Sequence, residues 1–259
     1  METVKLWKVK NPIVVAITLI YNKLDFCKRA VESFLNFNGL EPENLRYILW
    51  DQGAPYPDVK EWLDGMRQDE RVEVWGDGVN IGVGAALNAV IESTESAYVY
   101  KFDDDNEFLP HTLPGQLMAY ILTENAGFPL GVLSADVVGV GKANGPYYEV
   151  EILPGMMLQC SPCVGGGACL YSRKILNEIG PFRADRLYGV EDGDFASKAV
   201  KKGYHNAYLK DYYHISYCRG EEADPEIDRW KLEYTFGRTS KSFEEWRNDR
   251  KDIYSNPGL

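Results

Sequence analysis

The feature that most constrains the fold is a series of apolar runs, each of which ends in polar or acidic residues. Ile13–Ile20 is a continuous apolar run, as expected of a parallel strand buried on both faces. Tyr47–Asp51 and Tyr98–Asp105 are further strand-like runs that end in carboxylates. In open α/β sheets, ligands bind where the carboxyl ends of the strands meet. The runs therefore predict an α/β fold with a mostly parallel central sheet, flanked by helices, and an acidic site at one edge.

Segments whose apolar residues have helical spacing lie between these runs, so predicted strands and helices alternate along the chain. Ala30 to Leu35 predict a helix that Asp25 could cap, and residues 55–66 predict a second helix. A short strand is expected over 72–75, and a glycine-rich turn then leads into a helix that ends near Ile91. This βαβαβαβ order predicts a nucleotide-binding half over about 13–110.

The alternation stops in the second half of the chain. A helix over 111–122 and a strand over 130–140 are followed by a predicted hairpin or loop over 139–154. We expect residues 111–217 to form a mixed second half that completes a site, in a domain that spans 1–217, with two strands over 203–209 and 212–217. Residues 218–259 are expected to be a helical extension, which could pack on that domain, cover the site or form a homodimer contact.

Composition narrows the class of protein. The net charge of −11 argues against nucleic-acid binding, which needs basic residues to neutralise phosphates. No apolar run approaches the ~18 residues that span a bilayer, and the N-terminus lacks the apolar core of a signal peptide. The 5 cysteines are unevenly spaced and predict no disulfide framework. We therefore expect a cytoplasmic protein; peripheral contact with the inner face of a membrane is left open.

Two acidic clusters are the candidate chemical groups. Asp103, Asp104 and Asp105 offer the oxygen ligands that Mg²⁺ or Mn²⁺ prefers, and strand alternation would place the first and third on one face. Glu191 and Asp192 lie in a second cluster, which could cap a helix or supply a general base. A solvated acidic turn is the alternative for the first cluster. A site that has metal ligands in the first cluster and a general base in the second explains why the chain carries two acidic clusters.

The glycine-rich turn at 76–87 could cradle a phosphate or serve close helix packing. It is the third βα turn and has Leu87 where a dinucleotide fingerprint requires its last glycine, so a Rossmann dehydrogenase is rejected.

An ordered series of motifs resembles the GT-A-fold glycosyltransferases of family 2, over about Ile13 to Tyr217. The series comprises Tyr21-Asn22, Trp50-Asp51-Gln-Gly53, Asn80-Ile-Gly82 with Asn88, Asp103-Asp104-Asp105, Gly166-Gly167, Tyr171-Ser-Arg173, Gly180-Pro-Phe182, Val190-Glu-Asp-Gly-Asp194, Gly203-Tyr204 and His214. Each motif is weak alone, whereas their order and spacing together are specific. The resemblance implies the GT-A fold with a C-terminal helical extension. It also implies that residues 1–217 are the catalytic domain and that residues 111–217 form its acceptor-side half.

The resemblance also implies roles for residues of this sequence. Residues expected to bind the nucleotide are Thr18, Tyr21, Asn22, Asp51, Asn80, Gly82, Asn88, Asp103 and Asp104. Residues expected to hold Mn²⁺ or Mg²⁺ are Asp105, Asp103 and His214. Residues expected around the donor sugar and acceptor are Gly166, Gly167 and Glu191, with Asp192 as the base whose pKa burial raises.

The implied activity is transfer of one sugar from a UDP-, GDP- or dTDP-linked donor to a hydroxyl, by metal-assisted direct displacement with inversion. The acceptor could be a glycan, a lipid-linked glycan or a protein. The Gln-x-x-Arg-Trp motif of processive members is absent, and Asp228-Arg-Trp230 is only a superficial echo of it. Two alternatives are a non-catalytic nucleotide- or carbohydrate-binding module on the same fold and a sugar nucleotidyltransferase.

Overall fold

The computed structural model describes residues 12–138, 148–217 and 225–254. Its elements are β1 (Val14–Ile20), α1 (Leu24–Phe37), the 3-10 helix η1 (Pro42–Asn44), β2 (Leu45–Asp51), α2 (Pro57–Met66), β3 (Glu73–Trp75), α3 (Val83–Glu92), β4 (Tyr98–Phe102), β5 (Asn106–Phe108), α4 (Thr112–Asn125), β6 (Leu130–Val138), β7 (Tyr148–Leu153), β8 (Met156–Cys160), β9 (Ala168–Ser172), α5 (Arg173–Ile179), α6 (Glu191–Lys201), β10 (His205–Ser216), α7 (Pro225–Thr235) and α8 (Phe243–Tyr254).

One sheet joins the strands in the order β3-β2-β1-β4-β9-β6-β10-β8-β7, with β5 paired to β10. Its first four strands are parallel, as the alternating pattern predicts. β9 then inserts antiparallel between β4 and β6, and β7, β8 and β5 also pair antiparallel. The α/β prediction is confirmed, while the sheet as a whole is mixed, because the second half returns through hairpins and short connections in place of regular βαβ crossovers.

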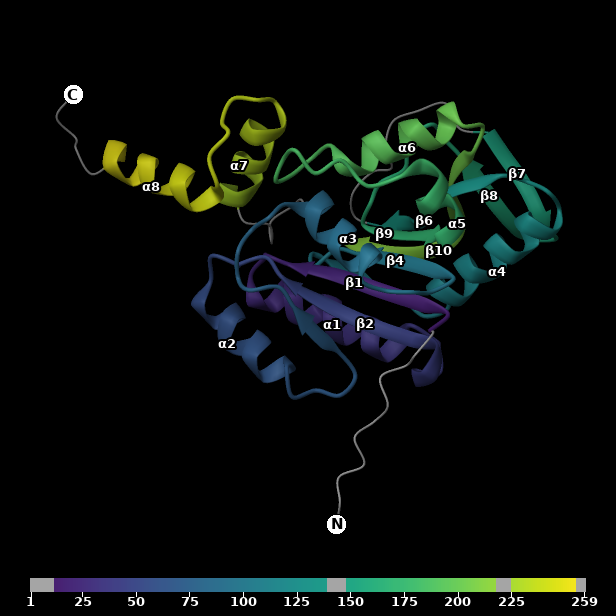
Figure 1. Ribbon diagram of the computed structural model, residues 1–259, viewed down its shortest axis with the longest axis horizontal. Coiled ribbons are helices and arrows are strands. Elements are labelled where there is room, and N and C mark those ends of the chain that lie inside the picture. Colours follow the sequence, from purple (N-terminus) through teal and green to yellow (C-terminus); the bar gives the residue numbers. More distant parts are fainter. Residues whose placement is uncertain (1–11, 139–147, 218–224, 255–259) are drawn as a thin grey trace, which may run out of the picture.

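Helices cover both faces of this sheet and bury a core on each (Figure 1). Alternate residues of β1 divide between the two cores: Val14 and Ala16 pack on the α1 side, and Val15 and Ile17 pack on the α3 side. Because both faces of β1 are buried, its sequence is apolar throughout, which is why this strand could be recognised from the sequence.

Several boundaries differ from the sequence-based expectations. Asp25 lies inside the first turn of α1, whose N-cap is Lys23, so it is no cap. One long strand, β10, replaces the two strands expected over 203–209 and 212–217. A register irregularity in its pairing with β6 lies between Leu209 and Tyr213, where the boundary between the two strands was expected. The predicted hairpin over 139–154 falls partly outside the described residues; its described part is β7, which pairs with β8.

The C-terminal helices form a small third core. Trp230 and Tyr234 of α7 pack with Phe243 and Trp246 of α8, and Tyr21 and Tyr188 of the main body lie against them. In Figure 1, α7 lies beside the main body and α8 extends away from it. None of the helices in the described ranges is long and apolar enough to cross a bilayer.

Candidate active site

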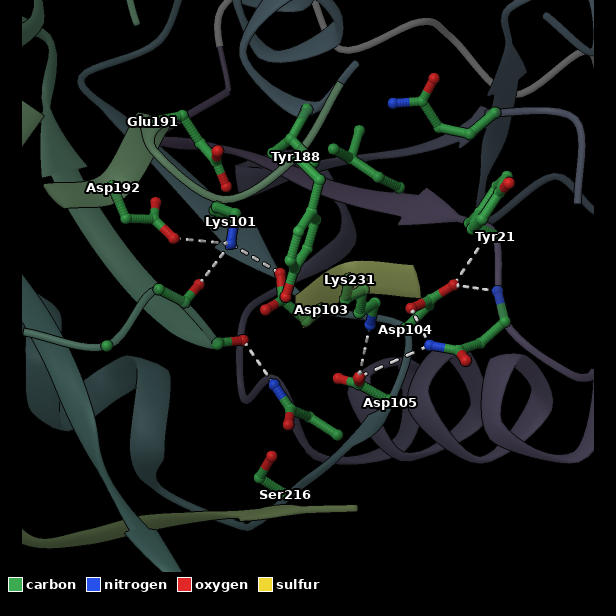
Figure 2. Close-up of a pocket in the computed structure, with 18 of the residues that line it drawn as sticks. Tyr21, Lys101, Asp103, Asp104, Asp105, Tyr188, Glu191, Asp192, Ser216 and Lys231 are labelled. Atoms are coloured by element: carbon green, nitrogen blue, oxygen red, sulfur yellow. Dashed lines mark hydrogen bonds and ion pairs between the residues drawn. The ribbon is translucent and has the colours of Figure 1, made fainter. Parts of the chain in front are cut away.

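A pocket of about 300 Å³ opens at the carboxyl end of the parallel strands. Segments far apart in sequence contribute to it: the β1–α1 turn, the end of β4, the glycines before β9, the start of α6, β10 and α7. Figure 2 shows the carboxylates of both acidic clusters facing this space. The site therefore lies where an α/β sheet conventionally binds its ligand.

The three aspartates of the first cluster differ in the contacts that they make. β4 ends at Phe102, so strand alternation does not govern them: Asp104 lines the pocket together with Asp103 and Asp105, and the expectation that only the first and third share a face is wrong. Asp104 is buried and accepts hydrogen bonds from the backbone N–H groups of Tyr21 and Asn22 at 2.6 and 2.7 Å. This carboxylate fixes the β1–α1 turn and lines the pocket at the same time.

Asp105 has weaker partners. Its Oδ2 lies 3.5 Å from Nδ2 of Asn22 and 3.8 Å from Nζ of Lys231. Burial raises the pKa of Asp105 to about 7, against the opposing effect of Lys231. A buried carboxylate with only long contacts is suited to binding a cation.

Lys101 joins the two acidic clusters and was missed in the sequence. Its buried ammonium donates to Oδ1 of Asp103 at 2.7 Å and to the carbonyl of Gly166 at 2.7 Å, and it reaches Oδ2 of Asp192 at 3.4 Å. Burial opposes its charge, yet the carboxylates raise the pKa of Lys101 well above its usual value. A lysine inside the otherwise apolar run Tyr98–Phe102 was the available signal, because an unpaired buried charge is too costly to keep.

The second cluster begins α6. Glu191 is buried, and its Oε2 accepts from the backbone N–H groups of Gly189 and Val190, both at 3.0 Å. Asp192 keeps about a quarter of its side chain exposed, and burial raises its pKa to about 6, as expected from the sequence. A Cβ atom at Gly166 would lie 1.7 Å from Oδ2 of Asp192, so only glycine allows this carboxylate its position.

His214 and Gly167 complete one wall of the pocket. His214 is buried on β10, and burial lowers its pKa to about 4, which leaves the imidazole neutral near pH 7. A Cβ atom at Gly167 would lie 2.9 Å from Nε2 of His214 and 2.6 Å from Nδ2 of Asn106. Close packing of these side chains therefore requires the glycine that the motif supplied.

The predicted nucleotide-binding residues separate into two groups. Tyr21, Asn22 and Asn80 line the pocket, together with the unpredicted Gln52. Asp51 is buried at the end of β2, where its Oδ1 accepts from the backbone N–H of Gly53, and it is not among the lining residues.

Three other predicted nucleotide contacts serve the fold. Thr18 is fully buried and hydrogen-bonded to the hydroxyl of Tyr47. Asn88 uses both ends of its amide on the backbone of Phe182, at 2.9 Å each. Gly82 has φ +89°, and a Cβ there would lie 2.7 Å from the carbonyl of Arg186. These three residues join separate segments and are not among the residues that line the pocket.

The pocket contains the donor types that a divalent cation needs. Asp103, Asp105 and His214 all line it, and the imidazole is neutral. Among the described residues, however, no three His, Cys, Asp or Glu side chains already converge on one point. Mg²⁺ commonly takes one or two carboxylates and completes its shell with phosphate and water. The residues present fit a cation of that kind, shared with a phosphorylated ligand.

Solved structures with a similar fold include the mannosyltransferase PcManGT from Pyrobaculum calidifontis in complex with GDP-Man and Mn²⁺ (TM-score 0.59, 16% identity, 92% of this chain and 67% of that chain). GalNAc-T7 with UDP, GalNAc and Mn²⁺ is similar at a TM-score of 0.64 and 13% identity, over 82% of this chain and 45% of that chain. S. aureus TarS 1-349 in complex with UDP-GlcNAc is similar at a TM-score of 0.58 and 18% identity, over 85% of this chain and 64% of that chain. The chain thus spans between 45% and 67% of the length of these proteins.

A search of curated protein sequences finds no match. The model of the family described as glycosyl transferase family 2 matches residues 15–180, from β1 to the end of α5. That match covers well over half of the chain and includes the strand ends that build the pocket, and the solved structures share the GT-A architecture. The chain belongs to glycosyl transferase family 2.

Proposed function

We propose that this protein is an inverting glycosyltransferase that moves a single sugar from a nucleoside-diphosphate donor to an acceptor hydroxyl. The observation that carries the proposal is the meeting of the two acidic clusters in one pocket, with Asp105 and Asp192 in different surroundings. Paired carboxylates with separate environments suit a division between cation binding and proton abstraction. The nucleotide sugars bound by PcManGT and TarS support the donor class.

On the donor side, Tyr21, Asn22 and Asn80 would contact the nucleotide, and their position in the lining of the pocket supports this. Asp103 and Asp105, with His214 as a further ligand, would hold Mn²⁺ or Mg²⁺ against the diphosphate. When bound, this cation would stabilise the charge that develops on the departing diphosphate. The Mn²⁺ in the similar structures of PcManGT and GalNAc-T7 supports this part of the proposal.

On the acceptor side, Asp192 would take the proton from the attacking hydroxyl. Its raised pKa makes it a stronger base than an ordinary carboxylate, and the ammonium of Lys101 keeps that rise moderate. The carboxylate of Glu191 accepts hydrogen bonds from the backbone of the preceding loop, so we assign Glu191 a role in positioning Asp192. A single displacement from the side opposite the diphosphate inverts the anomeric carbon.

Thermal-shift titration with UDP, GDP, dTDP and CDP, each with Mn²⁺, Mg²⁺ or EDTA, tests the donor class and the cation. A ligand of the folded state raises its stability by RT ln(1 + [L]/Kd). We expect one diphosphate to stabilise the protein strongly when a divalent cation is present and weakly in EDTA. If no nucleotide shifts the melting temperature, the glycosyltransferase proposal is wrong.

Release of nucleoside diphosphate from the matching sugar donor separates the alternatives. An active transferase releases it, with slow hydrolysis even when water is the acceptor. A non-catalytic module binds the donor and releases nothing, and a sugar nucleotidyltransferase releases pyrophosphate from a nucleoside triphosphate.

A further inference from the structure

A positive charge enters the pocket from α7, which lies outside the residues matched by the family model. Nζ of Lys231 is 3.8 Å from Oδ2 of Asp105 and 5.1 Å from the centroid of the Tyr188 ring. Figure 2 shows this side chain reaching into the space between the labelled aspartates and Tyr188. The C-terminal segment therefore contributes a charged group to a site that the rest of the chain builds.

The packing of α7 holds Lys231 in this place. The ring of the preceding Trp230 lies 6.3 Å from that of Tyr21 and 6.4 Å from that of Tyr188, measured between centroids. Tyr234, one turn further along α7, accepts a hydrogen bond from the backbone N–H of Leu187 at its hydroxyl. These contacts fix α7 on both sides of the lysine, so its position does not depend on the ion pair alone.

In the part of the chain that the structure describes, the ammonium of Lys231 has no hydrogen-bond acceptor. Among the described residues it has an ion pair at 3.8 Å, beyond hydrogen-bond distance, and a contact with an aromatic face. Its side chain is only 19% exposed. A largely buried ammonium normally has close acceptors, since leaving its donors unpaired costs free energy. The geometry points to an oxygen acceptor supplied by a ligand.

Charge indicates which ligand that is. The described lining of the pocket contains two cationic side chains, Lys101 and Lys231, and several carboxylates that would repel an anion. Lys101 already contacts Asp103, Asp192 and a carbonyl oxygen. Lys231 is thus the cation with donors left for a phosphate beside Asp105.

We propose that Lys231 binds a phosphate oxygen of the donor diphosphate, so that the C-terminal segment completes the donor site. The inference rests on the proposed function, because it takes a nucleoside diphosphate as the ligand. A role limited to balancing the charge of Asp105 makes the opposite prediction. In that case, removal of Lys231 frees the Asp105 carboxylate for a cation and strengthens cation-dependent binding of the diphosphate.

The test compares the full chain with Lys231→Met, which keeps most of the length of the side chain and removes its charge. Calorimetry would measure binding of UDP, GDP, dTDP and CDP, and of the nucleoside of each, in saturating Mg²⁺. For the diphosphate that binds the unmodified protein, we expect Lys231→Met to weaken binding ~10-fold or more, while the affinity of its nucleoside stays unchanged. Lys231→Arg should restore most of the diphosphate affinity.

Lys210→Met is the matched control. Lys210 of β10 is not among the residues that line the pocket and forms an exposed ion pair with Glu149 of β7, so this substitution removes one charge and should leave affinity unchanged. Equal or tighter binding of the diphosphate by Lys231→Met overturns the inference alone. Absence of binding of all four diphosphates by the unmodified chain overturns it together with the proposed donor class. Equal loss for nucleoside and diphosphate, with a lowered melting temperature, assigns Lys231 to structure and also overturns the inference.

Discussion

The two acidic clusters of the pocket are built on different supports and divide their carboxylates in the same way. Asp103 to Asp105 follow the end of β4, whereas Glu191 and Asp192 open α6. In each cluster one carboxylate is committed to backbone N–H groups of a loop: Asp104 holds the β1–α1 turn and Glu191 holds residues 189–190.

Asp105 and Asp192 keep incomplete partners. Asp105 is buried and Asp192 is half-buried; both have long contacts to lysines, and burial raises their pKa values to about 7 and about 6. The comparison teaches that burial alone does not mark a reactive carboxylate. Burial combined with few close donors does, because such a group can still gain a cation or a proton.

The sharpest test of this division is Asp192→Asn. We expect turnover to fall by ~10²-fold or more while binding of the nucleoside diphosphate changes little, because the amide cannot accept the acceptor proton. Initial rates of diphosphate release with acceptor, together with calorimetric binding, measure the two effects. Asp194→Asn, two residues further along α6 and ion-paired with Lys198 at 2.6 Å, is the control and should remain active. Full activity of the Asp192 variant would remove it from the chemical step.

Asp104, the carboxylate bound to backbone N–H groups in the first cluster, should affect the stability of the fold. Asp104→Ala would leave the buried N–H groups of Tyr21 and Asn22 without acceptors and should lower the free energy of unfolding by ~2–4 kcal/mol. Denaturant titration measures the change. Asp104→Asn keeps one acceptor oxygen and should cost less. If the alanine variant is as stable as the unmodified protein, Asp104 is not the structural member of its cluster.

The pH profile gives a smaller effect that separates Asp192 from its neighbours. Because its pKa in the folded protein is about 6, turnover should rise with pH up to that value and fall about tenfold per pH unit below it. Lys101→Met removes a charge that lowers the pKa of Asp192, so the acid limb of the profile should move to higher pH. An unmoved limb would show that another group titrates.

The same pKa predicts a stability change with a defined sign. The folded protein binds the proton of Asp192 more tightly than the unfolded chain does, so the free energy of unfolding should fall as pH rises from about 4 to about 6. Asp192→Asn should remove this part of the slope. Chemical denaturation across that pH range, without divalent cations, measures it.

The sequence alone determined the parallel strands β1 to β4 and the edge of the sheet at which the acidic residues lie. Local causes produce these features: β1 is apolar because both its faces are buried, and carboxylates at strand ends meet at one edge. The order of the motifs also identified the family. The division into residues 1–217 and 218–259 stays a prediction, since residues 218–224 lie outside the described ranges.

Tertiary structure decided which of the predicted residues share a pocket. Thr18 and Asn88 were expected to bind the nucleotide, yet they form hydrogen bonds with Tyr47 and with the backbone of Phe182. Lys101 and Lys231 matched no motif, yet they lie beside the carboxylates. The cause is that a polar side chain binds whichever partner the folded chain brings within about 3 Å, and that partner is set by contacts between segments distant in sequence.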